Sequence, residues 1–124
     1  MTNVGIIGLG HCVPKHAVTN MDLEKIVETS DEWITTRTGI KERRIARQDE
    51  FTSTMAVKAA KEALANAQLE GGDIELVIVA TTSPDSNFPS VACKVQNAIG
   101  ARHAAAFDVS AACSGYLYAL TTAK

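Results

Sequence analysis

The 124-residue sequence predicts an α/β fold with a mainly parallel sheet and helices on the faces of that sheet. Three observations support this class. Residues 76–80 are apolar on both faces, as expected of a parallel strand covered by helices. Residues 52–67 place small apolar side chains on one helical stripe, and residues 104–109 give a second short strand before a further helix. Strands and helices therefore alternate along the chain.

The N-terminal residues are expected to form a strand and then a short helix. Residues 4–9 are an apolar run interrupted by glycines, which predicts a first buried strand that ends in a turn before Pro14. Asn20 is a residue type that caps helices, and the helix after it would bury Leu23, Ile26 and Val27.

A second helix is predicted after Ser30, whose hydroxyl can cap an acidic first turn, and Gly39 suits the end of that helix. Residues 40–47 are highly charged and have the character of a hairpin or an edge strand. The helix over residues 52–67 is expected to stop before Gly71 and Gly72.

In the last third of the chain, Ser90 is expected to cap a helix that Gly100 ends. A final helix starts at Cys113 and is interrupted by the end of the chain. Such an end leaves carbonyls uncapped and an apolar face uncovered, so we expect the chain to be a piece of a longer polypeptide. Without a linker or repeat in between, residues 1–124 are interpreted as one domain.

Composition and charge argue against several classes of function. Lys and Arg number 12 against 14 Asp and Glu, and a net charge of -2 does not attract nucleic acid or an anionic membrane. The sequence has neither a secretory signal nor an apolar run of about 18 residues, so we expect a cytosolic protein. Cys12, Cys93 and Cys113 are an odd number without metal-site spacing, which predicts free thiols and no metal.

Some conspicuous residues are given no functional role. The glycines of residues 5–10 invite a dinucleotide-binding interpretation, but Val13 stands where the last glycine of that motif belongs, so close packing explains them better. The three histidines, the mixed charges of residues 41–44 and the thiols of Cys12 and Cys93 carry no chemical pattern. The histidines are His11, His16 and His103.

Cys113 is the strongest candidate for a nucleophile. It lies in a turn of small residues between the predicted strand 104–109 and the helix that follows. At a helix start, unpaired backbone N–H groups and the positive end of the dipole favour a thiolate and can hold an oxyanion. This arrangement suits attack on a thioester carbonyl. A buried structural cysteine is the alternative that the local sequence leaves open.

Three segments resemble one family. Ala-Ala-Cys-Ser-Gly at 111–115, after Phe107-Asp108, is similar to the active-site segment of the beta-ketoacyl-acyl carrier protein synthase III family. Thr-Ser-Asp-Glu-Trp-Ile at 29–34, continued by Thr-Arg-Thr-Gly-Ile at 36–40, resembles its N-terminal hallmark, and Ala-Thr-Thr-Ser at 80–83 with Phe-Pro-Ser at 88–90 matches a third motif. The resemblance spans nearly the whole chain and implies the N-terminal half of a thiolase-like fold, with the C-terminal half absent.

The resemblance also implies an activity and a set of site residues. Cys113 would take an acyl group from acyl-coenzyme A and condense it with malonyl-acyl carrier protein, giving 3-oxoacyl-acyl carrier protein, CO2 and coenzyme A. Thr29, Trp33 and Arg37 would bind coenzyme A, with the indole stacked on adenine. Phe88 would reach the acyl pocket of the neighbouring subunit of a homodimer, whose interface would lie beside residues 104–109.

The family's catalytic histidine and asparagine come from its second half, so this chain alone is expected to be inactive. No cofactor is implied beyond the coenzyme A thioester, which is a substrate.

Alternatives remain open from the residues alone. Trp33 could be a core residue, Arg37 a solvated charge at a helix end, and Phe88 a loop anchor packed on its own core. For the function, the alternatives are a related thiolase-fold acyltransferase or hydroxymethylglutaryl-coenzyme A synthase-like enzyme, and a non-catalytic module that binds acyl-coenzyme A.

Overall fold

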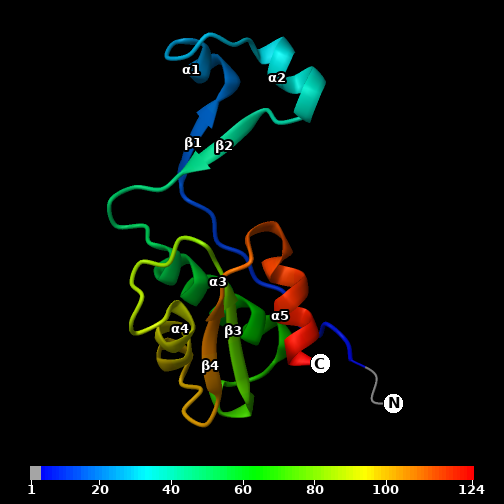
Figure 1. Cartoon of the computed structure of the whole chain (residues 1–124), viewed down its shortest axis with the longest axis vertical. Helices are drawn as coiled ribbons and strands as arrows, with labels where there is room; N and C mark the ends of the chain where they lie inside the picture. The colour runs from blue at the N-terminus through cyan, green and yellow to red at the C-terminus, as the bar shows by residue number, and fades with distance from the viewer. Residues whose placement is uncertain (1–3) are drawn as a thin grey trace. The chain divides into compact units, whose positions relative to one another are not determined.

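The computed structural model describes residues 4–124, which form two compact units. The smaller unit comprises residues 13–50, and the larger one comprises residues 51–124 together with the N-terminal segment up to Cys12. The smaller unit contains β1 (His16–Thr19), α1 (Asn20–Glu24), α2 (Asp31–Thr38) and β2 (Glu42–Ile45). The larger unit contains α3 (Thr52–Ala67), η1 (Gly71–Asp73), β3 (Leu76–Ala80), α4 (Val91–Ile99), β4 (Ala105–Val109), η2 (Ala112–Ser114) and α5 (Gly115–Ala123) (Figure 1).

The larger unit is built on the parallel pair β3 and β4, in which Leu76 lies opposite Ala105 and Ala80 lies opposite Val109. In the view of Figure 1, α4 and α5 flank this pair. Small and β-branched side chains form the core, with α3 residues packed against it; the buried members are Val77, Val91, Ala92, Val95, Ala101 and Ala104. The predicted α/β class and the parallel strands over residues 76–80 and 104–109 are confirmed.

The predicted first strand at residues 4–9 is wrong. This segment pairs with no strand of the described chain, and its side chains, such as Ile6 and Ile7, are exposed. It lies instead along α3, where the Leu9 carbonyl accepts a 2.6 Å hydrogen bond from Asn66 Nδ2. A Cβ atom at Gly10 would collide with the Ala59 carbonyl of α3. An apolar run predicts burial but not a pairing partner. The close-packing interpretation is confirmed for Gly8 and Gly10, which lie against α3, but not for Gly5, where a Cβ atom would meet nothing within 4 Å.

The predicted cap of α1 is also wrong. Thr19 caps this helix, because its Oγ1 accepts from the Asp22 N–H at 3.2 Å while the Asp22 carboxylate accepts from the Thr19 N–H at 3.1 Å. This reciprocal pair moves the helix start by one residue, and Asn20 becomes a buried first residue. The helix ends at Glu24, so Ile26 and Val27 lie outside it and are exposed.

The other predicted helix ends are largely confirmed. Ser30 Oγ accepts from the Trp33 N–H, and Ser90 Oγ accepts from the Cys93 N–H. Gly39 and Gly100 follow their helices with φ of 71° and 77°, a region that glycine adopts without strain. Helix α3 occupies the predicted 52–67 but ends with Gln68 at φ 57°, three residues before Gly71.

The charged segment at residues 40–47 contributes β2, which pairs antiparallel with β1. His16 lies opposite Ile45 and Thr19 lies opposite Glu42. The predicted hairpin or edge strand is therefore confirmed, whereas β1 was not predicted, because four residues with mixed polarity give no clear two-residue alternation.

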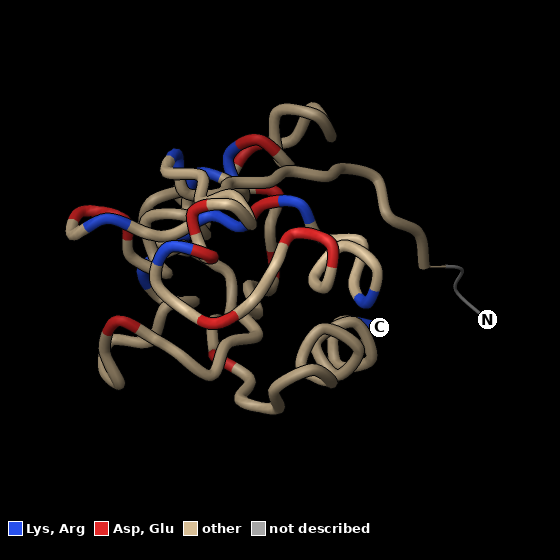
Figure 2. Tube along the Cα trace, turned by 90° about the horizontal axis from the view of Figure 1, so that it is seen from above, with Lys and Arg blue, Asp and Glu red and all other residues tan. Residues whose placement is uncertain are grey.

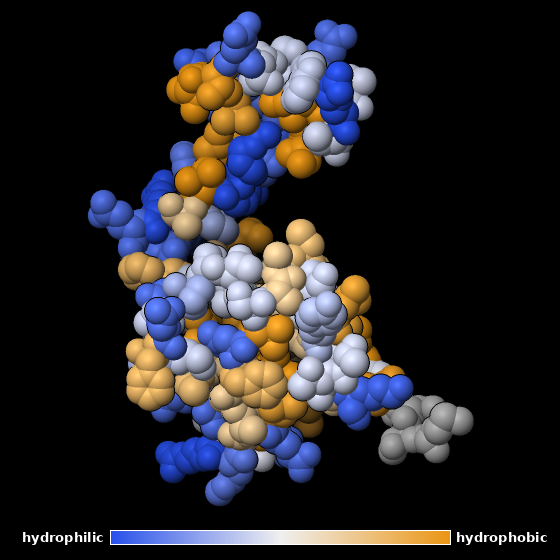
Figure 3. Space-filling model, in the orientation of Figure 1, coloured by the Kyte–Doolittle hydropathy of each residue, from blue (hydrophilic) through white to orange (hydrophobic). Residues whose placement is uncertain are grey.

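Charged and apolar side chains are distributed unevenly on the surface. Figure 2 shows acidic and basic residues interspersed along most of the trace, but none in α5, whose sequence is Gly-Tyr-Leu-Tyr-Ala-Leu-Thr-Thr-Ala. Figure 3 shows apolar side chains at the surface of both units. Large exposed apolar side chains gather in α5, namely Tyr116, Leu117, Tyr118 and Leu120. Such surfaces mark places of interaction.

Among residues 4–124, the structure contains no helix with the length and apolar character needed to cross a membrane.

Candidate active site

Cys113 lies between β4 and α5, on the short turn η2, and is exposed. The turn follows directly from the carboxyl end of the parallel pair, where the Thr81 N–H donates a 3.0 Å hydrogen bond to the Val109 carbonyl. Exposure rules out the alternative of a buried structural cysteine within this chain. The residue before it, Ala112, has a positive φ of 43°, a conformation that is uncommon for residues other than glycine.

The predicted start of the final helix at Cys113 is two residues too early. The α-helix begins at Gly115, and Cys113 belongs to the 3-10 turn ahead of it, closed by the Ser114 N–H bond to the Ala111 carbonyl. Gly115 is buried, and a Cβ atom there would lie 3.1 Å from Ala80 Cβ, so the start of α5 packs closely on the end of β3. This close contact is what places the turn at the edge of the sheet.

Asp108 supports the same edge from the side of α4. Its carboxylate accepts hydrogen bonds from the N–H groups of Val91 at 2.9 Å and Ala92 at 2.7 Å, the first two residues of α4. Asp108 is part of a sequence motif, but its hydrogen bonds to the start of α4 were not predicted. An acidic residue near the end of a strand, followed by small residues, was the available signal.

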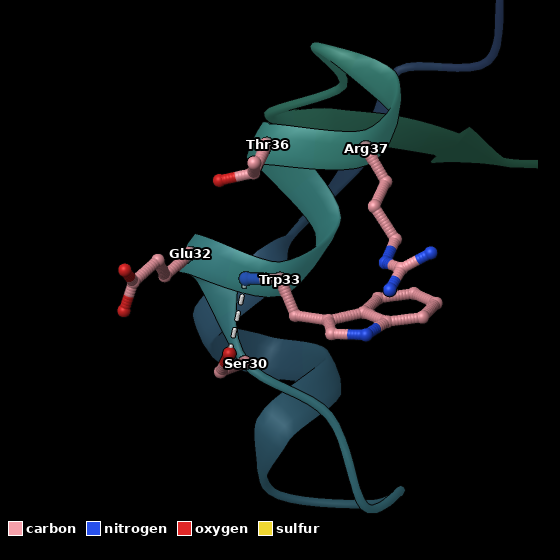
Figure 4. Close-up of a pocket in the computed structure, with 5 residues that line it drawn as sticks. All are labelled: Ser30, Glu32, Trp33, Thr36 and Arg37. Atoms are coloured by element: carbon pink, nitrogen blue, oxygen red, sulfur yellow. Dashed lines mark hydrogen bonds between the residues drawn. The ribbon is translucent and has the colours of Figure 1, made fainter.

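Thr29, Trp33 and Arg37 are brought together in the smaller unit. Trp33 and Arg37 lie one turn apart on α2, and the Arg37 guanidinium carbon is 4.9 Å from the centre of the indole (Figure 4). This is the distance of a cation–π contact. Thr29 precedes the helix, next to its cap Ser30.

Two hollows flank the Trp33 side chain. One, of about 250 Å³, is lined by Glu28, Thr29, Ser30 and Trp33. The other, of about 350 Å³, is lined by Ser30, Glu32, Trp33, Thr36 and Arg37, the residues drawn in Figure 4. Trp33 is 55% exposed, so the alternative that it is a core residue is wrong for this chain. An exposed indole beside a guanidinium offers a flat stacking face and a positive charge, which suits a nucleotide.

Phe88 lies on the loop between β3 and α4 and is 91% exposed, so it is not packed on the core of this chain. The base of its loop is held to α3: Thr52 Oγ1 donates to the Ser83 carbonyl at 2.8 Å, and the Ser53 N–H donates to the Asp85 carboxylate at 2.8 Å. Phe88 is therefore an exposed aromatic side chain on a loop that is anchored to α3.

Asp85 is the ion-paired anchor of that loop. Lys94 Nζ of α4 lies 3.1 Å from its carboxylate. Partial burial raises the pKa of Asp85, but the hydrogen bonds from Ser53 and the nearby Lys94 ammonium outweigh this and lower the pKa to about 2. The carboxylate is therefore ionised throughout the neutral range and holds both helices.

Several of the residues that were given no role have structural partners. His11 Nδ1 lies 3.4 Å from Glu62 Oε1, and Cys93 Sγ lies 3.9 Å from the Ala106 carbonyl. Arg43 and Arg44 of the charged segment bond to residues of their own unit. All three cysteines are free thiols. Within residues 4–124, no group of three or more His, Cys, Asp or Glu side chains is arranged to hold a metal ion.

Comparison with known proteins relates the sequence to one kind of enzyme. The chain is 62% identical over 122 residues to beta-ketoacyl-acyl-carrier-protein synthase III 1 of Bacillus cereus, a match that covers 98% of this chain and 39% of that protein. The chain thus spans about two fifths of the length of the curated relatives it matches. No protein-family model matches the chain.

Solved structures agree with this relationship. The crystal structure of 3-oxoacyl-acyl-carrier-protein synthase III from Aquifex aeolicus superposes with a TM-score of 0.90 at 58% identity, over 95% of this chain and 38% of that one. The priming beta-ketosynthase of the R1128 polyketide pathway gives a TM-score of 0.91 at 37% identity, over 95% of this chain and 35% of that one. In both sequence and fold, the chain therefore matches part of a beta-ketoacyl-acyl-carrier-protein synthase III.

Proposed function

We propose that the protein carrying this chain is the initiating condensing enzyme of type II fatty acid synthesis, with Cys113 as its acyl-accepting nucleophile. The observation that carries the proposal is an exposed thiol at the carboxyl edge of a parallel strand pair, in a chain 62% identical to a synthase III over nearly its whole length. The neighbouring residues from Ser110 to Gly115 are small, so a substrate carbonyl has room to approach.

In the first half-reaction, the Cys113 sulfur attacks the carbonyl carbon of acyl-coenzyme A. The bond between that carbon and the coenzyme A sulfur breaks, and the coenzyme leaves as a thiol after taking a proton. The acyl group is then held as a thioester on Cys113. This splitting of one transfer into two steps is the ordinary benefit of a covalent nucleophile.

In the second half-reaction, malonyl-acyl carrier protein loses CO2, and the resulting carbanion attacks the acyl-Cys113 carbonyl. A carbon–carbon bond forms, the bond to the Cys113 sulfur breaks, and 3-oxoacyl-acyl carrier protein leaves. The histidine and asparagine that promote decarboxylation in the family would be supplied by the part of the protein outside this chain. The 124 residues alone are therefore expected to be inactive in condensation.

Thr29, Trp33 and Arg37 are proposed to bind the nucleotide end of coenzyme A. Support comes from their position around two adjoining hollows and from the guanidinium held 4.9 Å above the indole. Phe88 is proposed to reach the acyl pocket of a second copy in a homodimer, and its 91% exposure on an anchored loop supports this role. A cytoplasmic location, a thiolase-like domain over residues 1–124 and the absence of any cofactor besides the thioester substrate belong to the same proposal.

A related enzyme with another acceptor is the second candidate, and the match to a priming ketosynthase of polyketide synthesis favours keeping it. The test is to supply the full-length protein with acetyl-coenzyme A and malonyl-acyl carrier protein and to measure CO2 and 3-oxoacyl-acyl carrier protein together. Equal yields of both, lost in Cys113→Ala, are expected. Acyl transfer without CO2 release would instead assign the acyltransferase alternative, and no acyl-Cys113 at all would assign the non-catalytic module.

A further inference from the structure

Helix α2 carries Trp33 and Arg37, but it has little hydrophobic anchoring. None of its eight residues is buried. An isolated helix of this length is unstable in water, and most helices in proteins are held by packing of an apolar face. The position of Trp33 and Arg37 must therefore depend on polar contacts to the rest of the smaller unit.

Besides the Asp31 N–H, which donates to Glu24 Oε1 at 2.6 Å, these contacts are made by Asn20. Its side chain is 1% exposed, and its Nδ2 group donates to Asp31 Oδ1 at 2.7 Å and to the Ile40 carbonyl at 2.8 Å. Thr35 Oγ1 lies 3.3 Å from the same nitrogen. Asp31 is the first residue of α2 and Ile40 follows its terminal Gly39, so one buried amide joins both ends of the helix.

The oxygen of the Asn20 side-chain amide is hydrogen-bonded to the β1–β2 sheet of the same unit. Asn20 Oδ1 accepts a 2.6 Å hydrogen bond from Arg43 Nη2 on β2, and Arg43 Nη1 donates to the Val18 carbonyl of β1 at 3.1 Å. A guanidinium only donates and a carboxylate only accepts, so the residue between Arg43 and Asp31 must offer an acceptor on one side and donors on the other. Asparagine does so, whereas aspartate would place a second negative charge against Asp31.

The face of α2 that is hydrogen-bonded to Asn20 is not the face that carries Trp33 and Arg37. Asp31 and Thr35 are one turn apart and point to Asn20, while Trp33 and Arg37 are one turn apart on the other side of the helix. We propose that Asn20 is a positioning residue that holds α2 so that Trp33 and Arg37 are preformed to receive the nucleotide end of coenzyme A. This inference rests on the proposed function of that site.

The test compares two acyl donors in the full-length protein. Acetyl-coenzyme A carries the nucleotide, and the acetyl thioester of N-acetylcysteamine does not. For each, KM and kcat of acyl transfer to Cys113 are measured in the wild type and in Asn20→Asp, Asn20→Ala and the double variant Asn20→Asp with Asp31→Asn. The control is Asn97→Asp, the same chemical change at an exposed position of α4.

The wild type is expected to prefer acetyl-coenzyme A through a lower KM. Misplacing a binding group by about 1 Å can cost up to roughly 100-fold, so Asn20→Asp should raise the KM for acetyl-coenzyme A by about 10- to 100-fold. The kcat, and all constants for the short thioester, should stay unchanged. Asn97→Asp should match the wild type, and the double variant should regain part of the loss because it removes the like charges. Should Asn20→Asp not fold, Asn20→Ala removes the bonds without adding charge and carries the same expectation.

Different failures have different meanings. A wild type that uses both donors with the same KM overturns the nucleotide site itself, and the role of Asn20 with it. A wild-type preference that persists unchanged in the Asn20 variants overturns only the positioning role. An equal loss for both donors assigns Asn20 to general stability and likewise overturns the proposal.

Discussion

The hydrogen bonds between Asp108 of β4 and the start of α4 lead to a prediction about stability, whose magnitude follows from the structure. Asp108 accepts hydrogen bonds from the N–H groups of Val91 and Ala92 at 2.9 and 2.7 Å, so its carboxylate occupies the N-terminal end of α4. In Asp108→Asn, one amide oxygen keeps one of these bonds, while the NH2 group faces the other donor. A hydrogen bond to a charged group contributes about 1.5 to 3 kcal/mol, and a charge at a helix end adds about 0.3 to 1 kcal/mol.

The free energy of unfolding should therefore fall by about 2 to 4 kcal/mol in Asp108→Asn, a large part of the roughly 5 to 15 kcal/mol of an ordinary domain. Urea titration of the chain, followed by far-ultraviolet circular dichroism, measures the loss. The control is Glu75→Gln, which removes an exposed carboxylate from the same unit. A change in Asp108→Asn of no more than about 0.5 kcal/mol, as expected for an ordinary surface substitution, would refute the capping role.

Three further predictions concern other parts of the chain. Because the pKa of Asp85 is lowered to about 2, the contribution of this carboxylate to stability is complete above the unfolded pKa near 4 and is lost as the pH falls toward 2. Between pH 5 and pH 2 the urea midpoint should therefore fall less steeply in Asp85→Asn than in the wild type. Identical slopes in the two proteins would contradict this. Gly10→Ala should destabilise the chain by about 1 to 3 kcal/mol through collision with α3, whereas Gly5→Ala, with open space around it, should be near neutral in the same titration. Trp33→Ala should raise the KM for acetyl-coenzyme A by roughly 5- to 150-fold, the equivalent of about 1 to 3 kcal/mol for one stacked base, and leave the short thioester unaffected; an unchanged KM would exclude stacking.

Strongly periodic segments of the fold were predictable from the sequence. The helix over residues 52–67 and the strand over residues 76–80 match the structure because their apolar patterns are long and unambiguous. Serine caps and glycine stops fixed the bounds of α2 and α4 for the same local reason. Each of these signals lies within the element that it describes.

The errors arose where a distant or competing partner decides the structure. Residues 4–9 have the composition of a strand but lie along α3 without a strand to pair with. Thr19 takes the cap of α1 because Asp22 completes a reciprocal pair, which leaves Asn20 free to join α2 and β2. The burial of Asn20, like the bonds of Asp108, depends on residues that come together only in the folded chain.

The residues of the candidate site could be predicted from the sequence, but their exposure and contacts could not. The motifs predict Cys113, Trp33 and Arg37 as site residues, and the structure adds that all three are exposed and that Trp33 and Arg37 are in contact. The residues alone had allowed burial of Cys113 and Trp33, since neither residue type is diagnostic of function. Whether Cys113 becomes acylated stays a prediction.

The most direct test of this prediction is peptide mass spectrometry of the full-length protein after incubation with acetyl-coenzyme A. The expected result is one acetyl group on the peptide that contains Cys113, with the peptides of Cys12 and Cys93 unmodified as internal controls. The adduct should be absent in Cys113→Ala. A folded protein that carries no adduct on Cys113, or carries it equally on all three cysteines, would contradict the assignment of Cys113 as the nucleophile.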